Sequence, residues 1–230
     1  MQKKYLIVAP NTGVGKTYIT CLLTKSLLKE NKKVLSLKPI ITGFDRLQEN
    51  DVSLILKAQN LEYNNENIEK ISPFRYKLPL AVNMAAKAEG KIIDPQEVIK
   101  FINQSREEYE YILIETAGGI MSPLAYRYNN LDLIKDLNLE VILVVGNYLG
   151  SISDALSALK LLEISNIKIV EIILNEMEEN LISLDVIKAI IREYTKVPVK
   201  VVMHGKNYCI NSKKPELTHL RPPDANGLFV

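Results

Sequence analysis

The chain of 230 residues is 47% hydrophobic and 24% charged, so it can bury one sizeable core and does not require a second domain. Its 29 basic and 27 acidic residues are spread along the sequence, and no basic block is available to follow a nucleic-acid backbone. No run approaches ~18 uninterrupted apolar residues, so we expect one cytoplasmic domain over residues 1–230, with neither a membrane nor a nucleic acid as partner.

The first predicted element is an apolar strand, residues 5–9, that leads into the loop NTGVGKT at residues 11–17. Backbone N–H groups of such a loop point at phosphate oxygens, Lys16 supplies an ammonium group, and Thr17 supplies a hydroxyl for Mg²⁺. Pro10 stands where the pattern GxxxxGKT has its first glycine. The alternative is a strand-to-helix turn that binds nothing, and the context of strand, loop and helix favours phosphate binding.

The rest of the chain alternates between helical and strand patterns. Apolar residues spaced by three and four predict helices at residues 16–30, 51–59, 80–89, 94–109, 151–162 and 181–194. Short apolar runs predict further strands at residues 34–37, 111–114, 141–145, 167–174 and 198–202. Residues 60–67 are polar and predicted to form a loop. This alternation predicts an α/β fold of three layers, a doubly wound, mostly parallel sheet with helices on both faces.

Four side chains fall at or after the carboxyl ends of predicted strands, the edge where such sheets bind ligands. Glu115 and Asp51 are candidate carboxylates for Mg²⁺, and Lys38 could neutralise charge on a moving phosphoryl group. Asn175 could offer its amide to a base edge. Each has a plainer interpretation: a solvated acid, a helix cap, a surface lysine and a turn residue, respectively.

Taken in order, these motifs resemble the dethiobiotin synthetase family, P-loop enzymes of biotin synthesis. The resemblance covers residues 5–175. It depends on NTGVGKT, on LKP at 37–39 with TG at 42–43, on Asp51, on ETAGG at 115–119 with PL at 123–124, on VVG at 144–146 with LG at 149–150, and on Asn175. The resemblance implies closure of the cyclic urea of dethiobiotin from 7,8-diaminononanoate and CO₂ with MgATP. One amine forms a carbamate, the γ-phosphate activates it as a carbamic-phosphoric anhydride, and the second amine displaces phosphate.

The resemblance also implies a role for each matching position. The implied catalytic residues are Lys38, Lys16 and Thr12. The implied ATP contacts are Gly13, Val14, Gly15, Lys16, Thr17, Tyr18, Asp51, Glu115, Thr116, Ala117, Gly118, Asn175 at the adenine, and His204. The implied Mg²⁺ ligands are Thr17, Asp51 and Glu115. The implied substrate contacts are Thr12, Lys38 and Thr42, with Gly150, Ser151, Ile152 and Ser153 contributed across the interface of a homodimer to hold the substrate carboxylate.

The sequence departs from the family pattern at several positions. Ala9 replaces the first loop glycine, Thr116 replaces a usual glycine, and Val82 and Asn83 stand where the family has Pro and His. Residues 203–206 carry no aligned adenine motif, so the nucleotide preference stays open. A rival resemblance is to partitioning and assembly ATPases of the deviant-Walker group, whose nucleotide state controls partner binding. They carry a signature lysine where this chain has Asn11.

Overall fold

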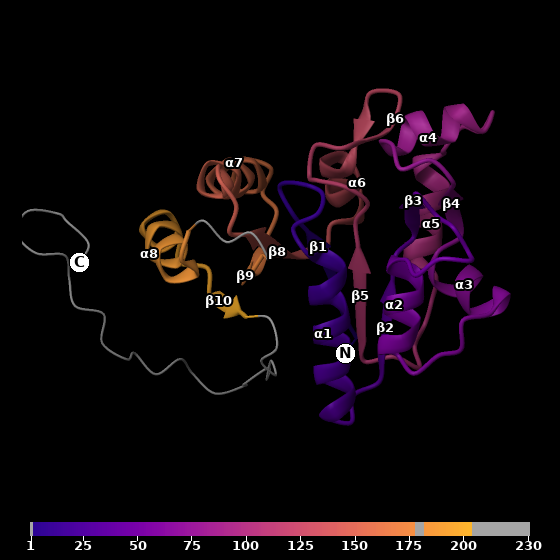
Figure 1. Ribbon diagram of the computed structural model, residues 1–230, viewed down its shortest axis with the longest axis horizontal. Coiled ribbons are helices and arrows are strands. Elements are labelled where there is room, and N and C mark those ends of the chain that lie inside the picture. The colour runs from indigo at the N-terminus through magenta and orange to yellow at the C-terminus, as the bar shows by residue number, and fades with distance from the viewer. Residues whose placement is uncertain (1, 178–181, 204–230) are drawn as a thin grey trace, which may run out of the picture.

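A computed structural model describes residues 2–177 and 182–203 of the chain (Figure 1). His204, which the resemblance implies as an ATP contact, and the C-terminal segment 211–230 lie outside the described residues. None of the helices in the described ranges has the length and apolar character needed to span a bilayer.

The centre of the molecule is a six-stranded sheet in the order β10-β9-β8-β1-β5-β2. Every pair of neighbouring strands in it runs parallel, which confirms the predicted sheet. Its strands are β1 (Lys3–Val8), β2 (Val34–Leu37), β5 (Tyr111–Glu115), β8 (Glu140–Gly146), β9 (Ile169–Asn175) and β10 (Val199–Val202). Two small sheets stand apart from it, a parallel pair of β3 (Ile40–Thr42) with β4 (Phe74–Tyr76) and an antiparallel pair of β6 (Pro123–Ala125) with β7 (Tyr128–Asn129).

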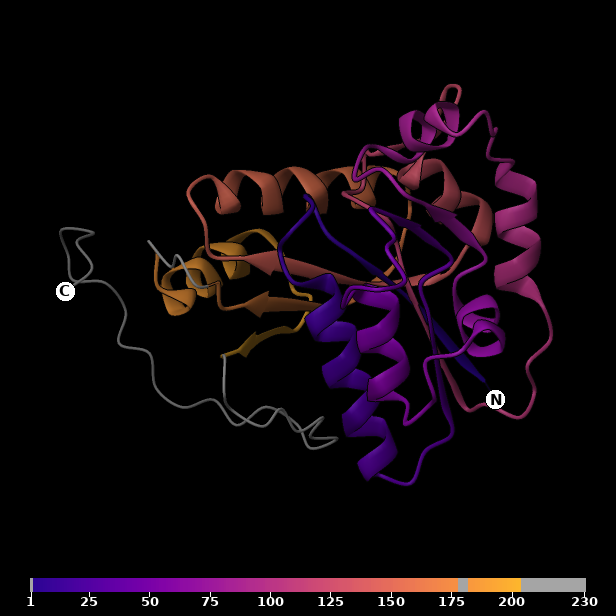
Figure 2. The same cartoon turned by 45° about the vertical axis from the view of Figure 1, so that its right-hand side comes forward.

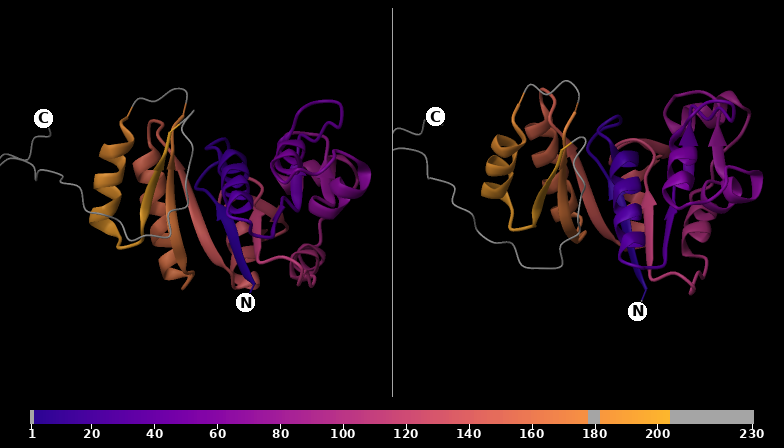
Figure 3. Two further views of the ribbon diagram at one scale, coloured as in Figure 1. Left: turned by 90° about the horizontal axis from the view of Figure 1, so that it is seen from below. Right: turned by 60° about the horizontal axis from the view of Figure 1, so that its bottom comes forward.

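Alternate residues of the central strands point into two separate apolar cores, one on each face of the sheet. In β1, Leu6 belongs to one core and Ile7 to the other. The helices are α1 (Lys16–Lys29), α2 (Asp51–Ala58), α3 (Asn65–Ile71), α4 (Val82–Ala88), α5 (Pro95–Asn103), α6 (Asn130–Leu137), α7 (Ser151–Ile164) and α8 (Leu184–Tyr194). Helix α1 covers one face and α2 lies alongside it (Figure 2). The buried residues of α2, like those of α5 to α8, belong to the core on the other face. Figure 3 shows α7 and α8 together beside the strands that they follow.

The structure corrects three parts of the predicted element order. Residues 65–67, predicted as loop, begin α3, because the Asn64 side chain caps this helix by accepting a hydrogen bond from the backbone N–H of Asn67. Helix α6 and the two small sheets were not predicted. The predicted helices at 80–89, 94–109 and 181–194 are shorter in the structure, where they occupy Val82–Ala88, Pro95–Asn103 and Leu184–Tyr194.

The strand order brings together segments that are far apart in sequence. Strand β5 lies between β1 and β2, with Ile7 paired to Glu115 and Leu37 paired to Ile114. The carboxyl ends of these three strands therefore deliver the glycine-containing loop, Glu115 and Lys38 to one edge of the sheet.

Candidate active site

The glycine-containing loop joins β1 to α1 as predicted. Gly13 and Gly15 have φ angles of +80° and +90°, a region that favours glycine. Gly15 occupies the N-cap position of α1, where no side chain makes a capping hydrogen bond within the described structure, and the first turn carries no acidic residue. The first backbone N–H groups of α1 are therefore available to an anion.

Asn175, at the end of β9, supports this loop from behind. Its Nδ2 donates to the carbonyl oxygen of Val14 at 3.1 Å, and a Cβ atom at Gly15 would lie only 2.2 Å from that nitrogen. The residue is 1% exposed, and Oδ1 has no hydrogen-bond partner in the described part of the chain. Asn175 thus fixes the shape of the loop, and the adenine contact implied by the resemblance stays a prediction.

Four predicted residues meet at the carboxyl edge of the sheet. Lys38 Nζ lies 2.5 Å from Asp51 Oδ2 and 2.5 Å from Glu115 Oε1. The Thr17 hydroxyl donates to Glu115 Oε1 at 2.7 Å. Both Glu115 and Lys38 are buried, at 1% and 5% exposure. Glu115 is therefore not a solvated acid and Lys38 is not a surface lysine, which excludes the plainer interpretation of each.

The position of Asp51 is equally specific. Asn50, not Asp51, is the N-cap of α2, because its Oδ1 accepts the backbone N–H groups of Val52 and Ser53 at 3.0 and 3.2 Å. The Asp51 carboxylate, in the first turn of the helix, is therefore left to meet Lys38. The helix-cap interpretation of Asp51 is thus excluded.

Burial and charge pull the ionisable groups of the site in different directions. Burial lowers the pKa of Lys16 to about 8, and the nearby ammonium group of Lys38 adds to this while Glu115 opposes it. Burial would also lower the pKa of Lys38, but the carboxylates of Glu115 and Asp51 outweigh it and raise that pKa. For Asp51, burial favours a higher pKa, yet Lys38 and a hydrogen bond from Thr17 outweigh it and lower that pKa. Lys38 and Asp51 are therefore both charged at neutral pH.

These groups surround one cavity of about 370 Å³. Its lining residues are Thr12, Gly13, Gly15, Lys16, Thr17, Lys38, Ile41, Thr42, Asp51, Glu115, Ala117 and Gly118. Sequence reasoning missed only Ile41 among them, and its place in the segment after Lys38 was the available signal. The predicted phosphate, metal and substrate residues of a single subunit thus largely share one space.

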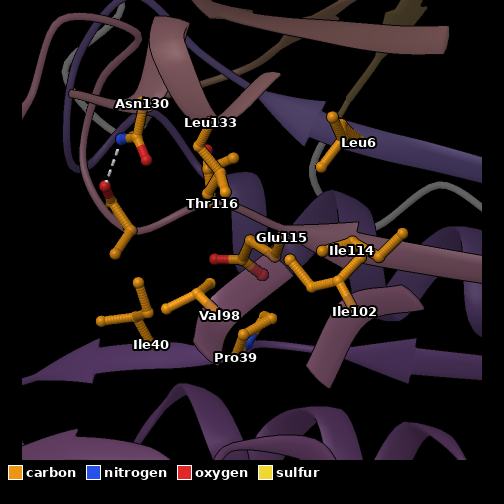
Figure 4. A pocket seen from close by; sticks show the side chains of 11 residues that line it. Leu6, Pro39, Ile40, Val98, Ile102, Ile114, Glu115, Thr116, Asn130 and Leu133 are labelled. Atoms are coloured by element: carbon orange, nitrogen blue, oxygen red, sulfur yellow. Dashed lines mark hydrogen bonds between the residues drawn. The ribbon is translucent and has the colours of Figure 1, made fainter. Parts of the chain in front are cut away.

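Other predicted contacts lie elsewhere. Thr116 points into the interior, where its hydroxyl contacts the carbonyl oxygen of Ile7 at 3.2 Å and it lines a cavity of about 10 Å³ behind the site (Figure 4). Val14 is buried in the core beneath α1, and Tyr18 packs against the same core. The predicted carboxylate contacts Gly150, Ser151, Ile152 and Ser153 begin α7 and do not line the 370 Å³ cavity.

The loop is also tied to α7 by a contact that the sequence did not reveal. Asn11 Nδ2 lies 3.0 Å from the Tyr148 hydroxyl and 2.5 Å from Asp154 Oδ2, and that hydroxyl donates to the same carboxylate oxygen at 2.6 Å. Burial, followed by the Asp154 hydrogen bond, raises the pKa of Tyr148 to about 12. The three side chains therefore hold the start of the loop against the first turn of α7.

The donor set fits a magnesium ion. Two carboxylates and a hydroxyl, from Asp51, Glu115 and Thr17, offer only oxygen, which Mg²⁺ prefers. The positive Lys38 ammonium group between the carboxylates indicates that this point in the site stabilises a cation. The described residues hold no cluster of three or more His, Cys, Asp or Glu side chains suited to a metal ion. Mg²⁺ does not need one, because it commonly binds through one or two carboxylates, waters and substrate phosphates.

A parallel sheet with a glycine-containing loop, lysine and threonine at the start of its first helix defines a P-loop nucleotide-binding protein. A family model described as an AAA domain matches residues 3–202. The chain belongs to this class and, within it, to the family of ATP-dependent dethiobiotin synthetases. It is 34% identical over 177 residues to the ATP-dependent dethiobiotin synthetase BioD of Phenylobacterium zucineum, covering 75% of this chain and 76% of that protein. With BioD of Clostridium botulinum it shares 32% over 206 residues, covering 87% and 90%.

Similar solved structures agree on the fold. A ParA family ATPase from Chlorobium tepidum has a TM-score of 0.55 at 20% identity, covering 90% of this chain and 86% of that one. The septum site-determining protein MinD of Pyrococcus horikoshii, solved with Mg-ADP, has a TM-score of 0.51 at 21% identity, covering 88% and 82%. At these identities the likeness concerns the arrangement of strands and helices alone.

Proposed function

We propose that this protein is an ATP-dependent ligase that closes the cyclic urea of dethiobiotin from 7,8-diaminononanoate and CO₂, releasing ADP and phosphate. The family of the chain supports the activity. The observation that carries the proposal is the meeting of Lys16, Thr17, Lys38, Asp51 and Glu115 around a single cavity of about 370 Å³. In-line phosphoryl transfer depends on positioned positive groups around the phosphates, and this cavity offers them.

The phosphates have a cradle in the loop and the start of α1. Backbone N–H groups there would bind the β- and γ-phosphates, and the Lys16 ammonium group would follow the γ-phosphate. Thr17, Asp51 and Glu115 would hold Mg²⁺, which would neutralise negative charge on the phosphates. Glu115 is kept in place by Thr17 and by Thr20, whose hydroxyl lies 3.0 Å from its Oε2.

Lys38 is the residue best suited to stabilise the transferring phosphoryl group. Its ammonium group is buried and lines the same cavity as Lys16, and its carboxylate partners keep it charged at neutral pH. A carbamate oxygen attacks the γ-phosphorus while the oxygen that bridges to the β-phosphorus leaves with ADP, so negative charge moves across this space. Thr12 and Thr42 would orient the carbamate and the amines before the second amine displaces phosphate from the carbamoyl carbon.

The carboxylate of the substrate would bind at the start of α7 in a second copy of the chain. Gly150, with φ +94°, is the N-cap of this 14-residue helix, and no side chain in the described structure caps it. The buried hydroxyl of Ser151 has no hydrogen-bond partner among the described residues. The Ser151 N–H donates to the Tyr148 carbonyl oxygen at 3.0 Å. The N–H groups of Ile152 and Ser153 and the Ser151 hydroxyl are therefore the donors that would suit a carboxylate. Because these residues do not line the cavity of their own chain, the proposal includes a homodimer with shared sites.

The decisive experiment measures phosphate release by the purified protein with MgATP, bicarbonate and 7,8-diaminononanoate. We expect release to require all three and to match the formation of a product that mass spectrometry identifies as dethiobiotin. Each component is omitted in turn as the control. Hydrolysis that persists without the diamine would contradict the proposal and favour a nucleotide switch of the partitioning type.

A further inference from the structure

The residue at the start of α6 makes contacts that sequence analysis did not reveal. Asn130 is 1% exposed and lies behind the loop that follows β5. Its Nδ2 donates to the carbonyl oxygens of Ala117 at 2.6 Å and of Gly119 at 2.8 Å. Figure 4 shows the first of these bonds as a dashed line. Because both neighbours are carbonyl oxygens, only the nitrogen of the amide can face them, and its orientation is fixed by chemistry.

The opposite side of the same loop packs against the start of the phosphate-binding loop. The Ile120 N–H donates to the carbonyl oxygen of Ala9 at 2.9 Å. A Cβ atom on Gly119 would lie 2.2 Å from the carbonyl oxygen of Pro10, so the two backbones approach as closely as a glycine allows. Residues 117–120 are thus held between the Asn130 amide and the backbone that follows β1.

Peptide geometry turns this contact into a constraint on the site. The carbonyl of one residue and the N–H of the next point in opposite directions across a trans peptide, and the described chain contains no cis peptide. The Gly119 carbonyl oxygen accepts hydrogen bonds from Asn130 Nδ2 and from the Ser122 N–H, the latter at 2.9 Å. Fixing it on that side aims the Ile120 N–H away from Asn130, and that N–H does reach Ala9. Fixing the Ala117 carbonyl in the same way aims the Gly118 N–H away from Asn130.

Gly118 lines the 370 Å³ cavity beside Lys16 and Lys38, and no hydrogen bond of the described structure uses its N–H. We propose that Asn130 is a positioning residue, which holds the Ala117 carbonyl inward so that the Gly118 N–H stays directed at the oxygens of the transferring phosphoryl group. This inference rests on the proposed function for the identity of the reaction. The geometry itself needs only a nucleotide with a γ-phosphate.

The contacts of Asn130 distinguish a positioning role from a role in stabilising α6 alone. The first position of a helix accepts many residues, and α6 is already capped by Asn129, whose Oδ1 accepts the N–H of Asp132 at 3.2 Å. Oδ1 of Asn130 has no hydrogen-bond partner within the described residues. The hydrogen bonds that its side-chain amide makes there are therefore those that Nδ2 donates to the carbonyl oxygens of the loop. Asn129 therefore provides a matched control, one residue away on the same helix end.

The test compares Asn130→Asp, Asn130→Ala and Asn129→Ala with the wild type. Asn130→Asp keeps the size but turns an acceptor towards two carbonyl oxygens, and Asn130→Ala is the milder variant should the first fail to fold. We expect both to lower turnover and the affinity for a non-hydrolysable ATP analogue by roughly 10- to 100-fold, because the γ-phosphoryl group loses a fixed donor. ADP affinity should stay within roughly twofold, since the cradle formed by the loop and α1 is unchanged.

Amide hydrogen exchange of the ligand-free protein provides a readout independent of activity. Exchange at residues 119–120 should become faster in both Asn130 variants. Asn129→Ala should lower Tm by about 2–4 °C and leave turnover and this exchange as in the wild type. Normal analogue affinity and normal loop exchange in Asn130→Ala would overturn the inference, as would an equal loss of turnover in Asn129→Ala. If the wild type makes no dethiobiotin while the Asn130 variants still lose analogue affinity selectively, the proposed function fails and the positioning role stands.

Discussion

Replacing Lys38 by methionine removes the ammonium group that lies 2.5 Å from both Asp51 Oδ2 and Glu115 Oε1. Methionine keeps most of the apolar stem, so the change is chiefly electrostatic. Removing one partner of a buried ion pair costs about 3–5 kcal/mol, because the remaining charge is left in a poorly solvated place. Glu115 is buried, whereas the Asp51 side chain is 40% exposed and partly screened by water. We therefore expect the variant to lose ~3 kcal/mol of unfolding free energy at pH 7.

The pH dependence of this loss has a definite sign. The pKa of Lys38 is raised above 10.5, so its contribution to stability is fully present below pH 10.5 and is lost as the pH rises through the folded-state value. The pKa of Asp51 is lowered below 3.8, so its contribution is present above pH 3.8 and is lost as the pH falls through its folded-state value. The ion pair thus stabilises the wild type across the whole neutral range. In Lys38→Met the ammonium group that lowers the pKa of Asp51 is gone, whereas the burial that raises this pKa remains, so Asp51 should take up a proton more readily and the deficit should shrink from pH 7 to pH 5.

Urea unfolding followed by circular dichroism at pH 7 and pH 5, without nucleotide or magnesium, measures both effects. The double variant Lys38→Met with Glu115→Gln serves as the control, because it also removes the buried charge and should recover a large part of the loss at pH 7. A deficit below about 1 kcal/mol at both pH values would show that the two carboxylates are better solvated than their burial indicates. It would also refute the reasoning that they keep Lys38 charged.

Two further predictions concern Lys16 and Gly119. Because burial lowers the pKa of Lys16 to about 8, binding of ATP at pH 8 should be accompanied by proton uptake at Lys16. Calorimetry in two buffers of different ionisation enthalpy measures this uptake, and Lys16→Met should abolish it. Equal binding enthalpies in both buffers for the wild type would contradict the prediction. Gly119→Ala brings a Cβ atom to 2.2 Å from the carbonyl oxygen of Pro10 and should destabilise the protein by about 1–3 kcal/mol in urea unfolding. Gly90→Ala, at φ +66° with no atom within 4 Å of the added Cβ, is its control, and an equal or larger loss there would show that the predicted clash is relieved.

The site could be predicted largely because its residues follow strands. Lys38 and Glu115 each come directly after a short apolar run, and parallel strands place such positions at one edge of the sheet. What the sequence could not supply is that β5 lies between β1 and β2, which brings these two side chains, 77 residues apart, into contact. The strand order depends on the packing of whole layers, and no local pattern encodes it.

The contacts that sequence reasoning missed come from backbone shape. Asn175 was predicted at the adenine because its amide ends a strand, and that contact stays a prediction. What the sequence did not show is that Gly15 leaves a space that this amide fills from behind. Asn130 carries no motif, and its importance depends on the carbonyl directions of a loop 11 and 13 residues earlier in the chain. Side chains that bind backbone groups leave no periodic signal, so only the fold reveals them.

The ParA family ATPase and the MinD protein share the arrangement of strands and helices with this protein, so the fold cannot by itself distinguish a ligase from a partitioning ATPase. The distinction depends on side chains at the edge of the sheet. Asn11 stands where that group is expected to carry a lysine, and its amide is bound within its own chain to Tyr148 and Asp154. A neutral, tethered amide cannot extend a charge towards a neighbouring subunit, so the second positive group in this cavity is Lys38, which two carboxylates hold beside Lys16. Lys38 is 5% exposed and lines the cavity beside Lys16, a position that suits contact with a small molecule in the cavity, as the proposed ring-closing ligase requires.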